Sequence, residues 1–263
     1  MSFVDLGEVQ LFFTDEGVGG PPMLFVHGYT CDSHDWNWQL PHFESRHRVI
    51  AVDLRGHGRS SVPADGYEPA RFAADLAGLL EHLACEPVVA VGHSLGGLIV
   101  TALAVTHPTF VRAVIAVDPA YLVAEEVMRD VAPLRDALSD GDSVPLVQTI
   151  LDGADAATTP AFLRGWHRRR VAGIAPHVLR ETLLSMATDP RSPASGTAGE
   201  QFLGRRGCPV LSFFTDPKRS AADAALFRDP RSRSVTWDAV GHWLHQERPD
   251  AFNECVDAWL ASL

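Results

Sequence analysis

Residues 87–105 read PVVAVGHSLGGLIVTALAV, and the expected architecture follows from this stretch. Its first five residues are typical of a buried strand, and the apolar residues after Ser94 continue long enough to form a helix. The turn between them, Gly92-His93-Ser94-Leu95-Gly96, has the form G-x-S-x-G. At such a turn a serine adopts a strained backbone and exposes its hydroxyl at the edge of a sheet. We therefore predict that Ser94 is a nucleophile, with a chance match in a glycine-rich turn as the alternative.

Similar apolar runs occur on both sides of this stretch. They are MLFVHG at 23–28, RVIAVDLRG at 48–56 and VRAVIAVD at 111–118. Runs of this kind are typical of parallel strands that are covered on both faces. Residues 69–84 repeat apolar side chains at helical spacing, and residues 8–17 partly alternate, as in a hairpin. This order of elements predicts a doubly wound α/β sheet.

The alternation stops after Asp118, and residues 121–199 are expected to form mainly helices and loops. The predicted segments are, in order, helices at 125–138, 145–153, 161–173 and 177–187, a loop at 191–200, strands at 208–216 and 232–242, and an amphipathic helix at 249–263. We therefore expect one sheet-based core formed by residues 1–120 and 200–263. A helical cap is inserted into it at 121–199.

The composition argues against several classes of protein. The 263 residues are 46% hydrophobic and 21% charged, and the formal net charge is -11. These values indicate a globular chain and argue against nucleic acid as a partner. The uncharged stretch 87–105 contains His93 and glycines, which are poor material for a lipid-facing helix. We expect no membrane partner.

Four cysteines, at positions 31, 85, 208 and 255, are far apart and form no CxxC pair. Because no histidine spacing suggests zinc either, we expect no metal, no cofactor and a reduced compartment. Asp5 and Glu8 stand where a signal peptide would carry basic and then apolar residues. The sequence therefore predicts a cytoplasmic protein that acts on a small molecule. Its oligomeric state stays open, a homodimer included.

A serine nucleophile needs a base and a site for the developing negative charge. His242 follows the last strand pattern and precedes the last helix, so it is the predicted base. His245 is expected to pack at the start of that helix. The backbone N–H groups of Leu95 and Tyr29 are the predicted oxyanion hole, and His27 is expected to be a structural hydrogen-bonding residue.

With these motifs the chain resembles the α/β-hydrolase superfamily. The resemblance rests on the turn at Ser94, the pair His27-Gly28, the stretch DLRGHGRS at 53–60, and Gly241-His242 with the following Glu247 and Pro249. It covers residues 1–120 and 200–263, and it implies an eight-stranded, mostly parallel sheet flanked by helices under an inserted helical cap.

The acid that orients His242 departs from the family's commonest pattern. Counted from Pro209, the usual position of the acid is Lys218 in this chain, and Asp216 lies two residues earlier. The superfamily's other known position, directly after the preceding strand, is Asp118 here. We predict Asp118 because the usual position holds a lysine, and Asp216 remains the alternative.

The resemblance also limits the reaction, because the dehalogenase and epoxide-hydrolase branches use an aspartate nucleophile where this chain has Ser94. We expect a serine hydrolase that cleaves a small, fairly apolar carboxylic ester or lactone through an acyl-enzyme. The alternatives are a C–C bond hydrolase, a cofactor-free dioxygenase or a ligand-binding receptor of the same fold. Cys31 stands where the dioxygenases carry a substrate-binding histidine, and Leu95 stands where their S-H-G-G pattern has a histidine after the nucleophile, so both departures favour hydrolysis.

The substrate is expected between the edge of the sheet and the cap. The candidate binding residues are Trp166, Tyr121, Trp243 and Cys31. The basic run from Trp166 to Arg170 has two interpretations. It is either a solvated helical face or a source of one arginine that holds a carboxylate or carbonyl oxygen of the substrate.

Overall fold

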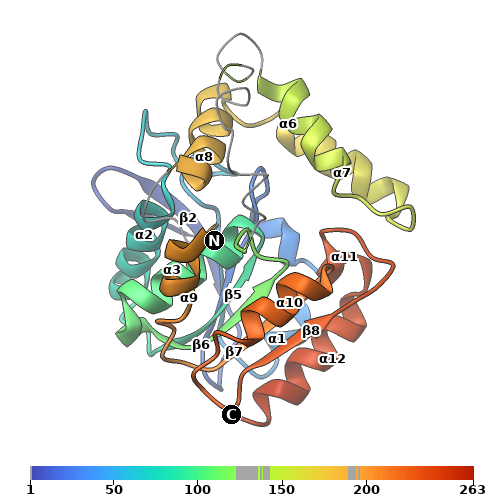
Figure 1. Cartoon of the computed structure of the whole chain (residues 1–263). Helices are drawn as coiled ribbons and strands as arrows, with labels where there is room; N and C mark the ends of the chain where they lie inside the picture. The colour runs from blue at the N-terminus through green and yellow to red at the C-terminus, as the bar shows by residue number, and fades with distance from the viewer. Residues whose placement is uncertain (1, 123–135, 137, 139–142, 189–193, 195) are drawn as a thin grey trace.

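The computed structural model describes residues 2–122, 136, 138, 143–188, 194 and 196–263. Its centre is an eight-stranded sheet in the order β1-β2-β4-β3-β5-β6-β7-β8 (Figure 1). The strands are β1 (Ser2–Asp5), β2 (Gln10–Glu16), β3 (Met23–Val26), β4 (Val49–Val52), β5 (Val88–His93), β6 (Val111–Val117), β7 (Val210–Phe214) and β8 (Arg233–Thr236). β2 pairs antiparallel with β1 and β4, and the other pairs are parallel. The predicted eight-stranded, mostly parallel sheet is confirmed.

The central strands are buried because helices cover both faces of the sheet. α2 (Pro69–His82) and α3 (Leu95–Thr106) lie on one face, and α12 (Pro249–Leu260) lies on the other (Figure 1). Successive residues of β3 alternate between the two apolar clusters, Leu24 in the first and Phe25 in the second. Burial on both faces therefore explains why these strands are continuous apolar runs.

α2 forms where its spacing of apolar residues predicts. Phe72, Leu76, Leu79 and Leu80 recur at three- and four-residue intervals and are fully buried. Pro69 occupies the first turn of the helix, where its missing N–H costs no hydrogen bond. One apolar stripe thus fixes the face of α2 that packs on the sheet.

Three predicted helices of the insertion are confirmed: α6 (Ser143–Asp152), α7 (Ala161–Val171) and α8 (Pro176–Thr188). We call them the cap helices. They lie beyond the carboxyl ends of the central strands (Figure 1), where α6 and α8 border a cavity next to the end of β5. The helix expected at 125–138 lies outside the described residues except for positions 136 and 138.

A helix, α9 (Gly196–Leu203), begins within residues 191–200, where a loop was expected. The small residues of this segment have no strong helical pattern, but Leu203 is fully buried in the cluster on the α2 and α3 face. Tertiary packing therefore overrides the local composition here. None of the described helices combines the length and apolar character that a membrane span needs.

Candidate active site

Ser94 lies at a sharp turn between β5 and α3. Its backbone has φ +51° and ψ −114°, a region that residues other than glycine rarely adopt. A Cβ atom on Gly92 would lie 2.2 Å from the carbonyl oxygen of Gly96, and one on Gly96 would lie 2.2 Å from that of Val26. Side chains are therefore excluded at both glycines of the motif. The tight turn leaves Ser94 facing a cavity at the carboxyl edge of the sheet.

The carboxylate beside His242 is that of Asp118, directly after β6. Its Oδ2 lies 2.6 Å from Nδ1 of His242. Asp216 faces elsewhere, because its Oδ1 accepts a 2.8 Å hydrogen bond from the backbone N–H of Lys218 and caps α10 (Pro217–Ala224). Of the two acids considered from the sequence, the structure brings Asp118 to His242 and Asp216 to the start of a helix.

The surroundings of Asp118 keep it ionised. Burial raises the pKa of this carboxyl, but the charge and hydrogen bond of His242 and the charge of Arg219 outweigh it and hold the pKa below its ordinary value. Because a carboxylate only accepts hydrogen bonds, Nδ1 of His242 is the donor in this contact, and in a neutral imidazole Nε2 is then the nitrogen with the free lone pair. An imidazole in this tautomer can take a proton from a hydroxyl group.

His242 is held by backbone contacts on the turn between β8 and α11 (Leu244–Glu247). Its N–H donates to the carbonyl oxygen of Ala154 at 3.0 Å. Its own carbonyl oxygen accepts a 3.0 Å hydrogen bond from Nε2 of His93. Since His93 precedes the serine, this bond ties the His242 turn to the turn between β5 and α3.

Two backbone N–H groups are the candidates for the oxyanion hole beside the serine. Leu95 is the first residue of α3, so its N–H has no acceptor within the helix. The loop after β3 runs against the serine, because a Cβ atom on Gly28 would lie 3.3 Å from Cβ of Ser94. Tyr29 follows, and its hydroxyl donates to the carbonyl oxygen of Leu179 at 2.6 Å. An oxyanion hole from Leu95 and Tyr29 remains a prediction compatible with this geometry.

His27 and His245, which the sequence analysis expected to be structural, have buried surroundings that fit this expectation. His27 is fully buried; its Nδ1 donates to the carbonyl oxygen of Gly28 at 2.8 Å, and its Nε2 accepts from the N–H of Leu54 at 3.0 Å. His245 is also fully buried, and its ring lies 4.5 Å from that of Trp36.

A cavity of about 200 Å³ lies over the serine. It is lined by Tyr29, His93, Ser94, Ile150, Leu151, Ala154, Leu183, Met186, His242 and Trp243. The cap helices α6 and α8 supply the apolar roof. The sequence reasoning missed these roof residues, because helical spacing does not separate an apolar side chain that faces a core from one that faces a cavity.

The family is shown by a match over most of the chain. A model of the alpha/beta hydrolase fold matches residues 21–197. The chain belongs to the α/β-hydrolase fold family. The resemblance noted from its motifs is thereby confirmed.

Curated relatives match parts of this α/β-hydrolase. A 2-(acetamidomethylene)succinate hydrolase of Mesorhizobium japonicum is 42% identical over 115 residues, which are 44% of this chain and 41% of that protein. A non-heme haloperoxidase of Rhodococcus erythropolis is 43% identical over 99 residues, which are 37% of this chain and 36% of that protein. The chain thus matches less than half the length of either relative.

Solved structures match nearly the whole fold of this α/β-hydrolase. An N-acyl homoserine lactone degrading enzyme superposes with a TM-score of 0.82 at 24% identity, over 98% of this chain and 99% of that one. An enol-lactonase from Burkholderia xenovorans superposes with a TM-score of 0.83 at 18% identity, over 99% and 100%. At these identities the likeness shows the shared fold.

Of the four side chains expected at the substrate, this α/β-hydrolase has one in the cavity lining. Trp243 lines the cavity. Tyr121 and Cys31 are 0% and 2% exposed and lie outside the lining, because their side chains fill the packed interior. Trp166 also lies outside it, with its ring 4.1 Å from the guanidinium of Arg170.

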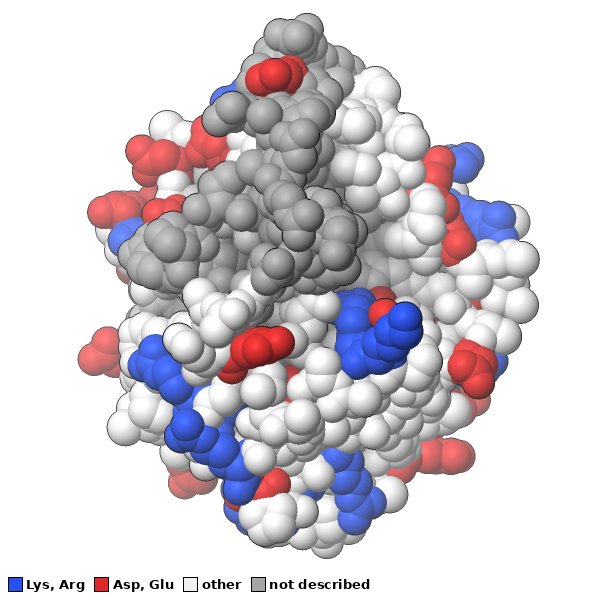
Figure 2. Space-filling view, in the orientation of Figure 1, with Lys and Arg blue, Asp and Glu red and all other residues white. Residues whose placement is uncertain are grey.

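The basic run of α7 divides between surface and interior. Arg168 pairs with Asp152 at the surface, with 2.9 Å between Nε and Oδ1. Arg170 points inward and donates to Oδ1 of Asp35, which is fully buried. One arginine of the run, Arg170, therefore does point into the protein, but it binds the carboxylate of Asp35 and not a substrate. On the face shown in Figure 2, acidic and basic side chains are interspersed.

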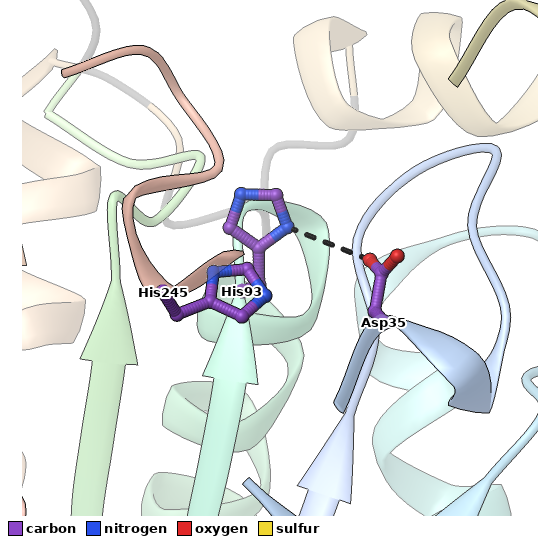
Figure 3. A group of neighbouring side chains, drawn as sticks. All are labelled: Asp35, His93 and His245. Carbon is purple, nitrogen blue, oxygen red and sulfur yellow. Dashed lines mark ion pairs between the residues drawn. The ribbon is translucent and has the colours of Figure 1, made fainter. Parts of the chain in front are cut away.

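Asp35, His93 and His245 form a buried group beside the cavity (Figure 3). Their potential ligand atoms lie within 4.8 Å of one another, and Nδ1 of His93 is 4.0 Å from Oδ2 of Asp35. A metal ion bound at about 2.1 Å to each atom would bring them within about 4.2 Å. Because Arg170 also balances the charge of Asp35, this α/β-hydrolase has a poor site for a cation there, and we assign none.

Proposed function

We propose that this chain is a serine hydrolase that cleaves a small, fairly apolar carboxylic ester or lactone through an acyl-enzyme. The observation that carries the proposal is the 2.6 Å contact between Asp118 and His242 beside the Ser94 turn. A nucleophile, a base and an acid that orients the base are the parts this chemistry needs. Membership of the α/β-hydrolase fold family supports the proposal.

In the first half-reaction, Nε2 of His242 takes the proton of the Ser94 hydroxyl as Oγ attacks the substrate carbonyl carbon. The carbonyl oxygen becomes an oxyanion that accepts hydrogen bonds from the N–H groups of Leu95 and Tyr29. His242 then returns its proton to the departing alkoxide. The alcohol leaves, or the lactone ring opens, and the acyl group stays on Ser94.

In the second half-reaction, His242 takes a proton from water, and the hydroxide attacks the acyl-enzyme. The oxyanion forms again at the same N–H groups, and the proton passes to Oγ of Ser94 as the carboxylic acid leaves. Asp118 stays ionised throughout and stabilises the imidazolium that forms twice in the cycle. The net reaction consumes one water and yields an acid and an alcohol.

The cavity lining supports the proposed substrate class. Within the part of the chain that the structure describes, no Lys or Arg lines the cavity, and Arg170 is occupied by Asp35. A dicarboxylate, such as the compound that names the Mesorhizobium relative, would find no counter-charge there. An uncharged acyl group that packs against the roof of α6 and α8 fits this space better.

Replacing the proposed nucleophile tests the function. Wild type and Ser94→Ala are incubated with p-nitrophenyl acetate, p-nitrophenyl butyrate and γ-butyrolactone, and acid release is recorded. We expect wild-type turnover and a loss of at least about 10³-fold in the variant. Ser45→Ala, at an exposed position, is the control and should keep full activity. Full activity in Ser94→Ala would exclude this serine as the nucleophile.

Two further measurements separate the alternatives. Mass spectrometry after an acid quench should find the added acyl group on wild type and not on Ser94→Ala. Turnover under nitrogen should equal turnover in air, since hydrolysis consumes no oxygen. Turnover that requires oxygen would favour a cofactor-free dioxygenase, and binding without turnover would favour a receptor.

A further inference from the structure

An arginine contacts the carboxylate that faces His242. Nη1 of Arg219, in α10, lies 3.0 Å from Oδ1 of Asp118. The other oxygen of that carboxylate, Oδ2, faces Nδ1 of His242 at 2.6 Å and the hydroxyl of Thr215 at 3.5 Å. Each carboxylate oxygen therefore has its own charged or chargeable partner.

The guanidinium of Arg219 is held in place on three sides. Nη2 donates to the carbonyl oxygens of Pro119 and, at 3.1 Å, of Tyr121. Its central carbon lies 5.0 Å from the ring centre of Phe214. The side chain is 22% exposed and that of Asp118 is 4% exposed. Such an anchored pair holds its geometry better than a surface ion pair between two mobile side chains.

We propose that Arg219 is a positioning residue that holds the Asp118 carboxylate toward His242 and shares the negative charge that would otherwise act on His242 alone. The inference rests on the proposed function of the Ser94 site. A fixed cation beside the carboxylate favours its ionised form and opposes a second positive charge on the neighbouring imidazole. Removing the cation should therefore let His242 hold its proton to a higher pH.

Other titratable and charged groups also lie around His242. His93, His167 and His245 interact with it electrostatically, and Asp155 lines the same surface hollow. Glu247 accepts a hydrogen bond from the N–H of Gly241, and Asp35 lies beside His93 and pairs with Arg170. Burial lowers the pKa of His167 to about 4 and of His245 to about 3, and it holds the pKa of His93 well below its ordinary value. These imidazoles are neutral at neutral pH, and Asp35 and Arg170 balance each other.

The titration of His242 tests the inference without relying on turnover. Arg219→Gln, Arg219→Met and Arg219→Lys are compared with wild type by histidine-labelled NMR, with His242→Gln to assign the signal. We expect the His242 midpoint to rise by about 0.5–1 pH unit in the Gln and Met variants and to stay near wild type in Lys. Lys218→Gln removes an exposed charge one residue away and is the matched control.

A pH profile of kcat/KM on p-nitrophenyl butyrate gives the second readout. Activity needs neutral His242, so the acid limb should move to higher pH by the same amount as the midpoint. An unchanged midpoint in both Gln and Met variants would overturn the inference, even if kcat fell, since lost packing alone would explain that fall. If the His242 midpoint moves in the Arg219 variants but wild type hydrolyses no ester, the proposed function is contradicted. The coupling of Arg219 to His242 would still stand in that case. Arg219→Met should keep an apolar contact with the Phe214 ring, so this variant is expected to preserve the packing of α10.

Discussion

Ser94 and Asp118 share an unusual backbone at neighbouring strand ends. Both have positive φ, +51° and +37°. The N–H of Ser94 donates to the carbonyl oxygen of Val117 at 2.9 Å, and that of Asp118 donates to the carbonyl oxygen of Phe213 at 2.8 Å. Such conformations cost about 1–3 kcal/mol each. The surrounding sheet therefore maintains strain at two of the residues to which we assign the chemistry.

Asparagine substitutions distinguish the two acids. Asp118→Asn keeps the shape of the side chain but removes the charge that stabilises the His242 imidazolium, so we expect kcat to fall by about 10³-fold or more. Asp216→Asn should change activity little, because asparagine also caps a helix. Hydrolysis of p-nitrophenyl butyrate checks both variants, with circular dichroism to verify folding. A loss confined to Asp216→Asn would reverse our assignment.

At the residue scale, the sequence could predict some of the candidate site residues and not others. Ser94 and His242 were predictable because each lies in a motif with a set place on the fold. The choice between Asp118 and Asp216 stayed open, because spacing along the chain does not show which loop bends toward His242. Arg219 belongs to no motif, and its contact with Asp118 depends on how α10 packs beside β7 and β8.

One buried carboxylate joins three elements. Asp35 lies in the short helix η1 (Ser33–Trp36), and its Oδ1 accepts hydrogen bonds from Arg170 of cap helix α7 and, at 2.9 Å, from Gln246 of α11. The Oε1 atom of Gln246 in turn accepts a 3.1 Å hydrogen bond from Nε2 of His167. These contacts fix α7 against the turn that carries His242.

Removing the arginine should weaken this junction. Arg170→Met leaves the Asp35 charge buried without its partner, so we expect the free energy of unfolding to fall by about 3–5 kcal/mol. Asp35→Asn together with Arg170→Met should recover part of the loss. Urea unfolding of the two single variants and the double variant measures the coupling. Arg168→Met, whose ion pair is at the surface, should change stability little; an equal loss in that control would contradict our account.

Elements differed in how well their sequences predicted them. Strands β3 to β7 were predictable because burial on both faces makes nearly every position apolar, with exposed Arg112 in β6 and the polar residues His93 in β5 and Ser212 in β7 as the exceptions. The cap helices were predictable as helices from their spacing, yet not the partners of their side chains. α9 was not predicted, since Leu203 stabilises it through a distant contact with the core that local composition does not show.

The whole molecule buries four histidines whose pKa values lie below their ordinary range: His57, His93, His167 and His245. Burial, the largest cause in each case, lowers the pKa of His57 to about 3. The unfolded chain binds protons at these groups near pH 6.5, and the folded chain does not. Their contribution to stability is therefore present above pH 6.5 and is lost as the pH falls toward the folded-state values.

This linkage predicts a steep acid dependence of stability. The free energy of urea unfolding should drop between pH 6.5 and pH 4.5, and His57→Gln should reduce the slope by about 1.4 kcal/mol per pH unit. His82→Gln, at an exposed position of α2, is the control and should leave the slope unchanged. Equal slopes for His57→Gln and wild type would mean that His57 does not contribute to the acid sensitivity.

The pairing of β6 with β7 has a consequence for synthesis. Val114 pairs with Val210, so β6 is joined to a strand that follows it by more than 90 residues in the sequence. On the ribosome, β6 emerges with its partner still unmade, and its apolar edge stays open until the cap has been translated. An open edge of this kind can recruit strands from other chains. We therefore expect this edge of β6 to be open to other chains while the residues between β6 and β7 are being made.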